Sequence, residues 1–146
     1  MEYARNEGED WRKEIRTWIV KNLGHSVFDP TQQTQTLLRS RFPHVDFRAL
    51  KTKDIDRFTT IVKKIVSFDS AEIAKRTDYV VCLWDRSAQR GAGTKGELTL
   101  AYYFGKPVYM VTRIPRDRIP GWVLGCTTRI FSSFAELKEF LMKHTL

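Results

Sequence analysis

Two apolar runs separated by a helix-like segment constrain the fold of this chain most strongly. The runs are "DYVVCLW", residues 78–84, and "KPVYMVT", residues 106–112. Continuous apolar runs of this length, rich in residues that favour strands, are typical of strands buried on both faces of a parallel sheet. Between them, residues 95–104 have the pattern of a helix. The sequence therefore predicts a mostly parallel sheet, built from strands that alternate with helices.

The N-terminal half supplies further elements. Apolar residues at helical spacing predict a helix over residues 8–23, and Gly24 is a plausible end for it. "HSVFDP", residues 25–30, is expected to form a short strand that Pro30 ends. Residues 31–52 are polar and basic with weak periodicity, so we expect a loop with some helix, in a position where a substrate lid can sit.

The remaining segments complete the alternation of strands and helices. A strong apolar helical face starts at Lys53, and "FDSAEIAKRT" is expected to follow as a second short helix that starts at Asp69 or Ser70. A long connection after the second apolar run leads to a short strand, "RIFSS", and a closing amphipathic helix, "FAELKEFLMKH".

These elements predict one α/β domain over residues 1–146, with a flavodoxin-like (Rossmann-like) parallel sheet and helices on both faces. Open sheets of this kind bind ligands at the carboxyl ends of their strands. This chain opens with a helix, whereas flavodoxin-like folds begin with a strand that lies centrally. Either the reading frame starts upstream of Met1, or the sheet is built without its usual first strand.

Composition limits the class of function. The net charge is +8, but the basic residues are spread along the chain and form no nucleic-acid-binding motif, so a polynucleotide partner is not expected. The three histidines and two cysteines lack metal-ligand spacing, and no metal or redox cofactor is implied. No apolar run approaches the roughly 20 residues that span a bilayer. We expect a cytoplasmic protein without disulfides, with Cys82 buried in a strand.

One acidic residue, Glu97, stands at the start of a helix in "GAGTKGELTLAYYFGKPVYMV", residues 91–111. Thr94 and Glu97 fit a capping box, in which a threonine hydroxyl and a glutamate three residues later satisfy free N–H groups of the first turn. The other hypothesis is that Glu97 points into a pocket and takes part in chemistry. The capping box is the better interpretation when these residues are taken alone.

The same stretch resembles nucleoside 2-deoxyribosyltransferases and the related nucleoside 5′-monophosphate N-glycosidases. The resemblance rests on the glycine-rich turn, on Glu97 at the start of a helix, on Ala101 one turn later, and on "GKPV" leading into a strand. Three other segments agree in order and spacing and bring the likeness to most of the chain: "EGEDWRKEI" with Trp11 and Arg12, "GHSVFDP", and "FDSAEIAKRTDYVV". Taken together, the segments favour a catalytic Glu97 over the capping box.

The resemblance implies a chemistry and a set of site residues. In that family a glutamate attacks the anomeric carbon of a sugar, releases the base and forms a glycosyl ester, which water or a second base resolves. By resemblance Glu97 is this nucleophile, and Asp69 positions the sugar and handles the proton on the leaving base. An N-cap role for Asp69 on the following helix remains an equal alternative. The transferases often carry a second aspartate shortly before the nucleophile, and this chain has none there.

A substrate-binding set follows from the start of the helix and from the resemblance. Free N–H groups at a helix N-terminus suit a phosphate, and turn glycines let the backbone approach a ligand. This favours a substrate with a 5′-phosphate, and we expect the pocket residues to be Tyr3, Ser87, Arg90, Gly91, Gly93 and Thr94.

The sequence thus predicts an enzyme that cleaves the N-glycosidic bond of a nucleoside or a nucleoside 5′-monophosphate, by transfer or by hydrolysis. The alternative is a non-catalytic nucleotide-binding or sensing module of the same fold. By resemblance alone, the chain is expected to form a homo-oligomer, with Tyr102, Tyr103 and Trp122 as packing or interface residues.

Overall fold

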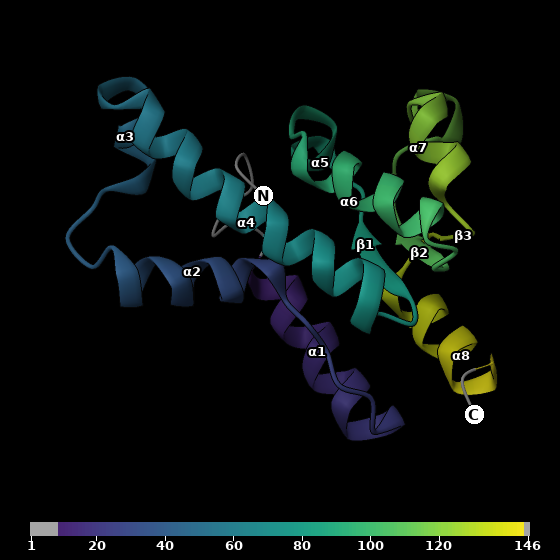
Figure 1. Cartoon of the computed structure of the whole chain (residues 1–146). Helices are drawn as coiled ribbons and strands as arrows, with labels where there is room; N and C mark the ends of the chain where they lie inside the picture. Colours follow the sequence, from purple (N-terminus) through teal and green to yellow (C-terminus); the bar gives the residue numbers. More distant parts are fainter. Residues whose placement is uncertain (1–8, 145–146) are drawn as a thin grey trace.

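The computed structural model describes residues 9–144, and its centre is a small parallel sheet (Figure 1). The sheet has three strands, β1 (Val80–Leu83), β2 (Val108–Val111) and β3 (Arg129–Phe131), in the order β1-β2-β3. Both pairings are parallel, with Val80 opposite Val108 and Tyr109 opposite Arg129. The α/β class and the parallel sheet are therefore confirmed. Tyr3 lies outside the described residues.

Helices connect and cover the strands. The chain runs through α1 (Glu9–Leu23), α2 (Pro30–Arg41), α3 (Phe47–Lys53) and α4 (Ile55–Arg76) before it reaches β1. A short helix, α5 (Arg86–Arg90), and α6 (Gly93–Tyr103) link β1 to β2, and the turn η2 (Arg116–Arg118) with α7 (Gly121–Cys126) links β2 to β3. The last helix is α8 (Phe134–His144).

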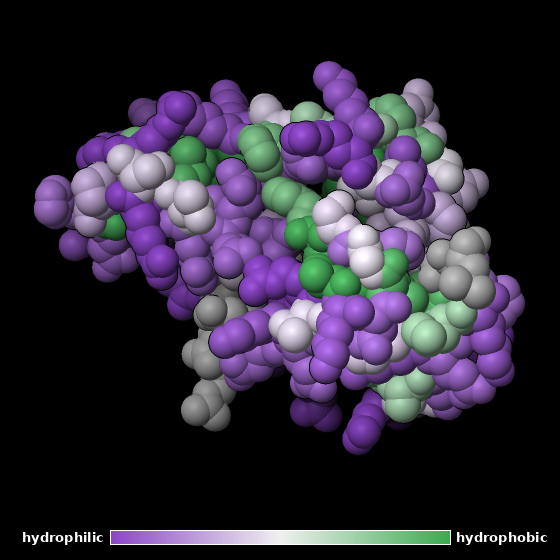
Figure 2. All heavy atoms as spheres, turned by 90° about the horizontal axis from the view of Figure 1, so that it is seen from below, coloured by the Kyte–Doolittle hydropathy of each residue, from purple (hydrophilic) through white to green (hydrophobic). Residues whose placement is uncertain are grey.

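The molecule has a helical arm on one side of the sheet. α2, α3 and the first half of α4 extend away from the strands (Figure 1). Seen from below, the surface of this arm is mostly hydrophilic, whereas apolar side chains gather in a hollow near the middle of the molecule (Figure 2). No helix within residues 9–144 is both long and apolar enough to cross a bilayer.

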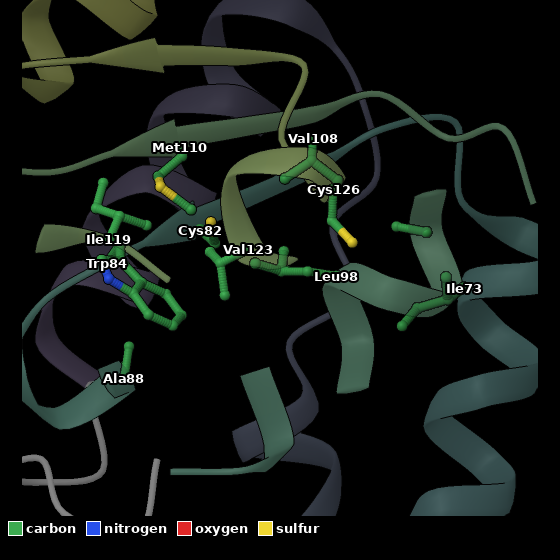
Figure 3. Close-up of a cluster of buried hydrophobic side chains, with 11 residues drawn as sticks. Ile73, Cys82, Trp84, Ala88, Leu98, Val108, Met110, Ile119, Val123 and Cys126 are labelled. Atoms are coloured by element: carbon green, nitrogen blue, oxygen red, sulfur yellow. The ribbon is translucent and has the colours of Figure 1, made fainter. Parts of the chain in front are cut away.

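Each face of the sheet has its own hydrophobic core, because side chains alternate along every strand. One core joins Cys82 of β1 and Met110 of β2 to α4, α6 and α7 (Figure 3). The other core joins Val111 of β2 and Phe131 of β3 to α1 and α8. Helices therefore cover both faces of the sheet. Cys82 is buried with a free thiol, as the sequence predicts, and burial raises its pKa to about 12.

Three expectations for the N-terminal half are wrong. Residues 31–52 are mostly helical, because Asp29 caps α2 and Asp46 caps α3. The helix expected from Lys53 and the second, short helix expected at residues 68–77 are one continuous helix, α4, which Asp54 caps and which contains no glycine or proline to break it. Residues 25–28 form no strand, because no strand among the described residues pairs with them.

The end of α6 is set by a glycine in a left-handed conformation. Gly105 has φ +69°, its N–H donates to the carbonyl of Tyr102, and the next N–H, of Lys106, donates to the carbonyl of Ala101. This pair of bonds is a Schellman motif, which closes a helix and turns the chain. The turn directs residues 106–107 into β2, and so it joins the helix that carries Glu97 to the central strand.

Substitutions at two glycines, Gly105 and Gly96, are expected to change the stability of the protein in opposite directions. We expect Gly105→Ala to destabilise the protein by about 1 kcal/mol, because alanine is strained at positive φ. We expect Gly96→Ala to stabilise it by about 0.5–1 kcal/mol, because Gly96 lies inside α6 and nothing lies within 4 Å of an added Cβ. Urea unfolding measures both changes. A Gly105→Ala variant as stable as the original would contradict the role of this turn.

Candidate active site

A cavity of about 930 Å³ opens beside β1 and contains Glu97 in its wall. Its lining comes from α1, from residues 25–30, from the C-terminal half of α4, from β1 and from the first two turns of α6. Ligands of parallel α/β sheets bind at the carboxyl ends of the strands. Arg12, Asp29 and Glu97 line this cavity, and Arg12 also interacts with Asp85, which follows the carboxyl end of β1.

Glu97 faces this cavity and does not cap its own helix. α6 begins at Gly93 with Ala92 as the N-cap, and no side-chain hydrogen bond caps it. Thr94 and Glu97 are therefore both inside the helix, and the capping-box interpretation is wrong. Thr94, Glu97 and Leu98 all line the cavity, as residues three and four apart on one helical face do. Leu98 is also buried in the core, which fixes the rotation of α6 about its axis.

A guanidinium, that of Arg12, is the main cation near Glu97. Arg12 Nε lies 3.7 Å from Asp29 Oδ1, and the side chains of both residues are largely buried. Asp29 is itself held in place, because its carboxylate accepts hydrogen bonds from the N–H groups of Thr31 and Gln32 at the start of α2. Burial lowers the pKa of Arg12, and the nearby carboxylates of Asp29, Glu97 and Asp85 oppose that change. Arginine remains charged even so.

Glu97 is therefore under two opposed influences. Burial raises its pKa, Arg12 acts against that rise, and Asp29 adds to it. A buried carboxylate beside a guanidinium keeps its charge more readily than one without a cation nearby. The pKa of Glu97 is raised overall, because burial outweighs Arg12, but the guanidinium limits the rise and so favours the ionised, nucleophilic form.

Asp69 is the second carboxylate of the site. It lies within the continuous helix α4, so the N-cap interpretation is wrong. Burial raises the pKa of Asp69 to about 7, and the charges of Glu97 and Glu72 contribute to the rise. The charge of Glu97 thus acts on the protonation of Asp69. Asp69 is not among the residues that line the cavity, whereas Phe68, Glu72 and Ile73 of the same helix are.

The described residues expected to bind phosphate fall into two groups, those that line the cavity and those that do not. Thr94 lines the cavity, but Ser87, Arg90, Gly91 and Gly93 lie outside its lining. Ser87 and Arg90 belong to the short helix α5, which Asp85 caps through the N–H of Ala88. Gly91 has an ordinary φ of −79°, so no left-handed conformation requires a glycine there. Within residues 9–144 no cluster of three metal-ligating side chains occurs.

Sequence reasoning missed the structural importance of Asp29, although a local signal for it exists. Asp29 followed by Pro30 is typical of a helix start, with the aspartate as N-cap and the proline in the first turn. That signal predicts α2 and fixes the carboxylate that pairs with Arg12. The proximity of Arg12 to Glu97 has no such local signal, because it depends on how α1 packs on the sheet.

Comparison with known proteins leaves the site to be interpreted from its geometry. No protein-family model matches this chain, and neither a curated protein nor a solved structure matches it.

The coupling between the two carboxyl groups can be measured by titration. We expect Glu97→Gln to lower the pKa of Asp69 from about 7, because the substitution removes a neighbouring negative charge. NMR of the Asp69 side-chain carboxyl carbon as a function of pH reports this value. The exposed Glu14 on α1 provides the control, and Glu14→Gln should leave the titration unchanged. An unchanged Asp69 titration in the Glu97→Gln variant would show that the two groups are not coupled.

Proposed function

We propose that this protein cleaves the N-glycosidic bond of a nucleoside or a nucleoside 5′-monophosphate, with Glu97 as the nucleophile. The proposal rests on the position of Glu97 in the wall of a cavity. There the Arg12 guanidinium opposes the rise in the pKa of Glu97, and the charge of Glu97 raises the pKa of Asp69. The parallel α/β fold is compatible with this chemistry, and the resemblance of the segments around Glu97 to deoxyribosyltransferases supports it.

The proposed reaction has two steps. A carboxylate oxygen of Glu97 attacks the anomeric carbon as the bond from that carbon to the base nitrogen breaks. The base leaves with the electron pair of that bond and takes a proton from the carboxylic acid of Asp69. Water, or an acceptor base, then attacks the anomeric carbon of the glycosyl ester and loses a proton to the Asp69 carboxylate, while the bond from that carbon to Glu97 breaks. This restores the carboxylate of Glu97 and the carboxylic acid of Asp69. Retaining glycosidases divide the work between two carboxyl groups in a similar way.

The surroundings of the two carboxyl groups support this division of roles. Burial raises the pKa of both groups, but Arg12 opposes the rise at Glu97, whereas the charges of Glu97 and Glu72 add to it at Asp69. Near neutral pH, a pair of carboxyl groups in different environments can supply one nucleophile and one acid.

We also propose a homo-oligomer, on the basis of an exposed aromatic surface at the C-terminal end of α6 and on α7. Tyr102, Tyr103 and Trp122 are 64%, 80% and 71% exposed, respectively. Trp122 is held in place by a hydrogen bond from its indole N–H to the Thr99 hydroxyl at 2.9 Å. Exposed tyrosine and tryptophan side chains are typical of contacts between proteins.

A base-release assay tests the proposed reaction. The wild-type protein is incubated with ribo- and deoxyribonucleosides and their 5′-monophosphates, and free base is measured by chromatography. We expect Glu97→Gln to reduce base release by about 1000-fold or more while ligand binding, measured by calorimetry, is kept. Glu14→Gln, an exposed change of the same kind, should release base at the wild-type rate.

The other outcomes of this assay are equally informative. Base release that persists in Glu97→Gln would exclude Glu97 as the nucleophile. Tight binding of a nucleotide by the wild type without release of base would favour the sensing module. Addition of a second base separates the two possible reactions, because a new nucleoside appears only if the sugar is transferred.

A further inference from the structure

Two basic segments that are far apart in the sequence meet at the carboxyl edge of the sheet. Residues 85–95 follow β1 and residues 113–118 follow β2. Because these two strands are adjacent and parallel, both segments leave the sheet at the same edge. Together the segments contain six basic and two acidic residues, which is half of the net charge of +8. The fold therefore gathers basic residues that are dispersed in the sequence.

The two segments are packed together as one unit. Ile119, at the end of η2, is buried in the same hydrophobic cluster as Ala88 of α5 (Figure 3). Gln89 of α5 adds two hydrogen bonds. Its side-chain N–H donates to the carbonyl of Arg118 at 3.1 Å, and its own carbonyl accepts from Lys95 Nζ at 2.7 Å. These contacts hold α5 against η2 and against the first turn of α6, so their exposed side chains share one surface.

This surface, which we call the arginine surface, carries five exposed guanidinium groups. They belong to Arg86, Arg90, Arg113, Arg116 and Arg118. No acidic side chain within residues 9–144 forms an ion pair with any of them. Of the two acidic residues in the segments, Asp85 accepts the N–H of Ala88 as the cap of α5. Guanidinium groups bind phosphates through two parallel hydrogen bonds, so the arginine surface suits a ligand that carries several phosphates.

A tryptophan ring borders the arginine surface. Trp122 follows η2 at the start of α7 and is 71% exposed, yet its ring is held in place. The indole N–H donates to the hydroxyl of Thr99 at 2.9 Å, and that hydroxyl donates to the carbonyl of Lys95 at 2.7 Å. Proteins that bind single-stranded nucleic acid combine cations along the phosphates with aromatic rings on which bases stack. Both features occur together on this side of the molecule.

We propose that the arginine surface binds single-stranded nucleic acid, with phosphates on the guanidinium groups and a base stacked on Trp122. Three other ligands fit less well. A mononucleotide has too few phosphates for five guanidinium groups, an acidic protein segment has no base for Trp122, and a duplex keeps its bases within the helical stack. Tyr102 and Tyr103, in the last turn of α6, remain for contact between copies of the chain.

This binding does not depend on the N-glycosidic reaction proposed above. Neither the five arginines nor Trp122 line the cavity that contains Glu97. Substitutions on the arginine surface therefore test the binding of nucleic acid without a change to the candidate nucleophile.

The salt dependence of binding tests the role of the guanidinium groups. A labelled oligothymidylate of about 20 nucleotides is titrated with the protein at several salt concentrations, and fluorescence anisotropy reports binding. One variant combines three substitutions on the arginine surface, Arg86→Gln, Arg116→Gln and Arg118→Gln. We expect it to bind about 100-fold more weakly than the wild type at about 0.1 M salt, because each lost phosphate contact removes about 0.7 from the slope of log affinity against log salt. A control variant loses three exposed arginines of α2 and α4 and should bind within about threefold of the wild type. Its substitutions are Arg39→Gln, Arg41→Gln and Arg57→Gln.

A strand without bases tests the role of Trp122. We expect Trp122→Ala to weaken binding of the oligothymidylate about tenfold, because the variant cannot stack a base, and to leave the salt slope unchanged, because no charge is removed. Binding of a strand of the same length made of abasic sugar phosphates should not change in this variant. Trp122→Phe, which keeps an aromatic ring, should bind the oligothymidylate within about threefold of the wild type.

Several results would overturn the proposal. Equal losses of affinity in the two triple variants would show that net charge alone attracts the strand. If Trp122→Ala affects the oligothymidylate and the abasic strand equally, or affects neither, the surface recognises a polyanion and not bases. Binding of a duplex or of polyglutamate as tightly as the single strand would also contradict the proposal, as would a wild type that does not bind the oligothymidylate at about 0.05 M salt. Base release is measured in none of these experiments, so the two proposals can fail separately.

Discussion

The parallel pairing of β1 with β2 is the constraint on which the rest of this structure depends. It fixes which side chains face each core, because Cys82 and Met110 turn to one face while Val81 and Val111 turn to the other. It also requires a crossover helix between the two strands. That helix is α6, which therefore begins at the carboxyl edge of the sheet and has Glu97 in its second turn. The position of the candidate nucleophile is thus a consequence of the topology.

Burial and one guanidinium determine the electrostatics of the site. Removal from water raises the pKa of both Asp69 and Glu97, but only Glu97 has Arg12 beside it. Arg12 is positioned by Asp29, whose carboxylate is held by the first turn of α2. The ion pair between Asp29 and Arg12 therefore links the cap of α2 to the charge of Glu97 on α6.

The sequence predicted those parts of the fold that have strong local patterns. The strands near residues 80 and 108, α1 and α8 were found because their apolar residues recur at the period of a strand or a helix. The sequence did not predict α2 and α3, which are polar and depend on capping aspartates. It also suggested a helix start at Asp69, which lies inside the continuous helix α4. The segment 25–28 has a strand-like pattern, but no strand within residues 9–144 pairs with it. Glu97 was proposed from the segments around it, and the resemblance put Arg12 near the expected site, whereas the ion pair of Arg12 with Asp29 required the tertiary structure.

The most direct test of this account is to trap the covalent intermediate. Wild-type protein is mixed with the substrate that gives base release, quenched in acid within milliseconds, digested and analysed by mass spectrometry. The account predicts that the peptide containing Glu97 is heavier by the mass of the sugar, or of the sugar phosphate, and that fragmentation places this mass on Glu97. Base release without any modified peptide, or with the sugar attached to another residue, would contradict it.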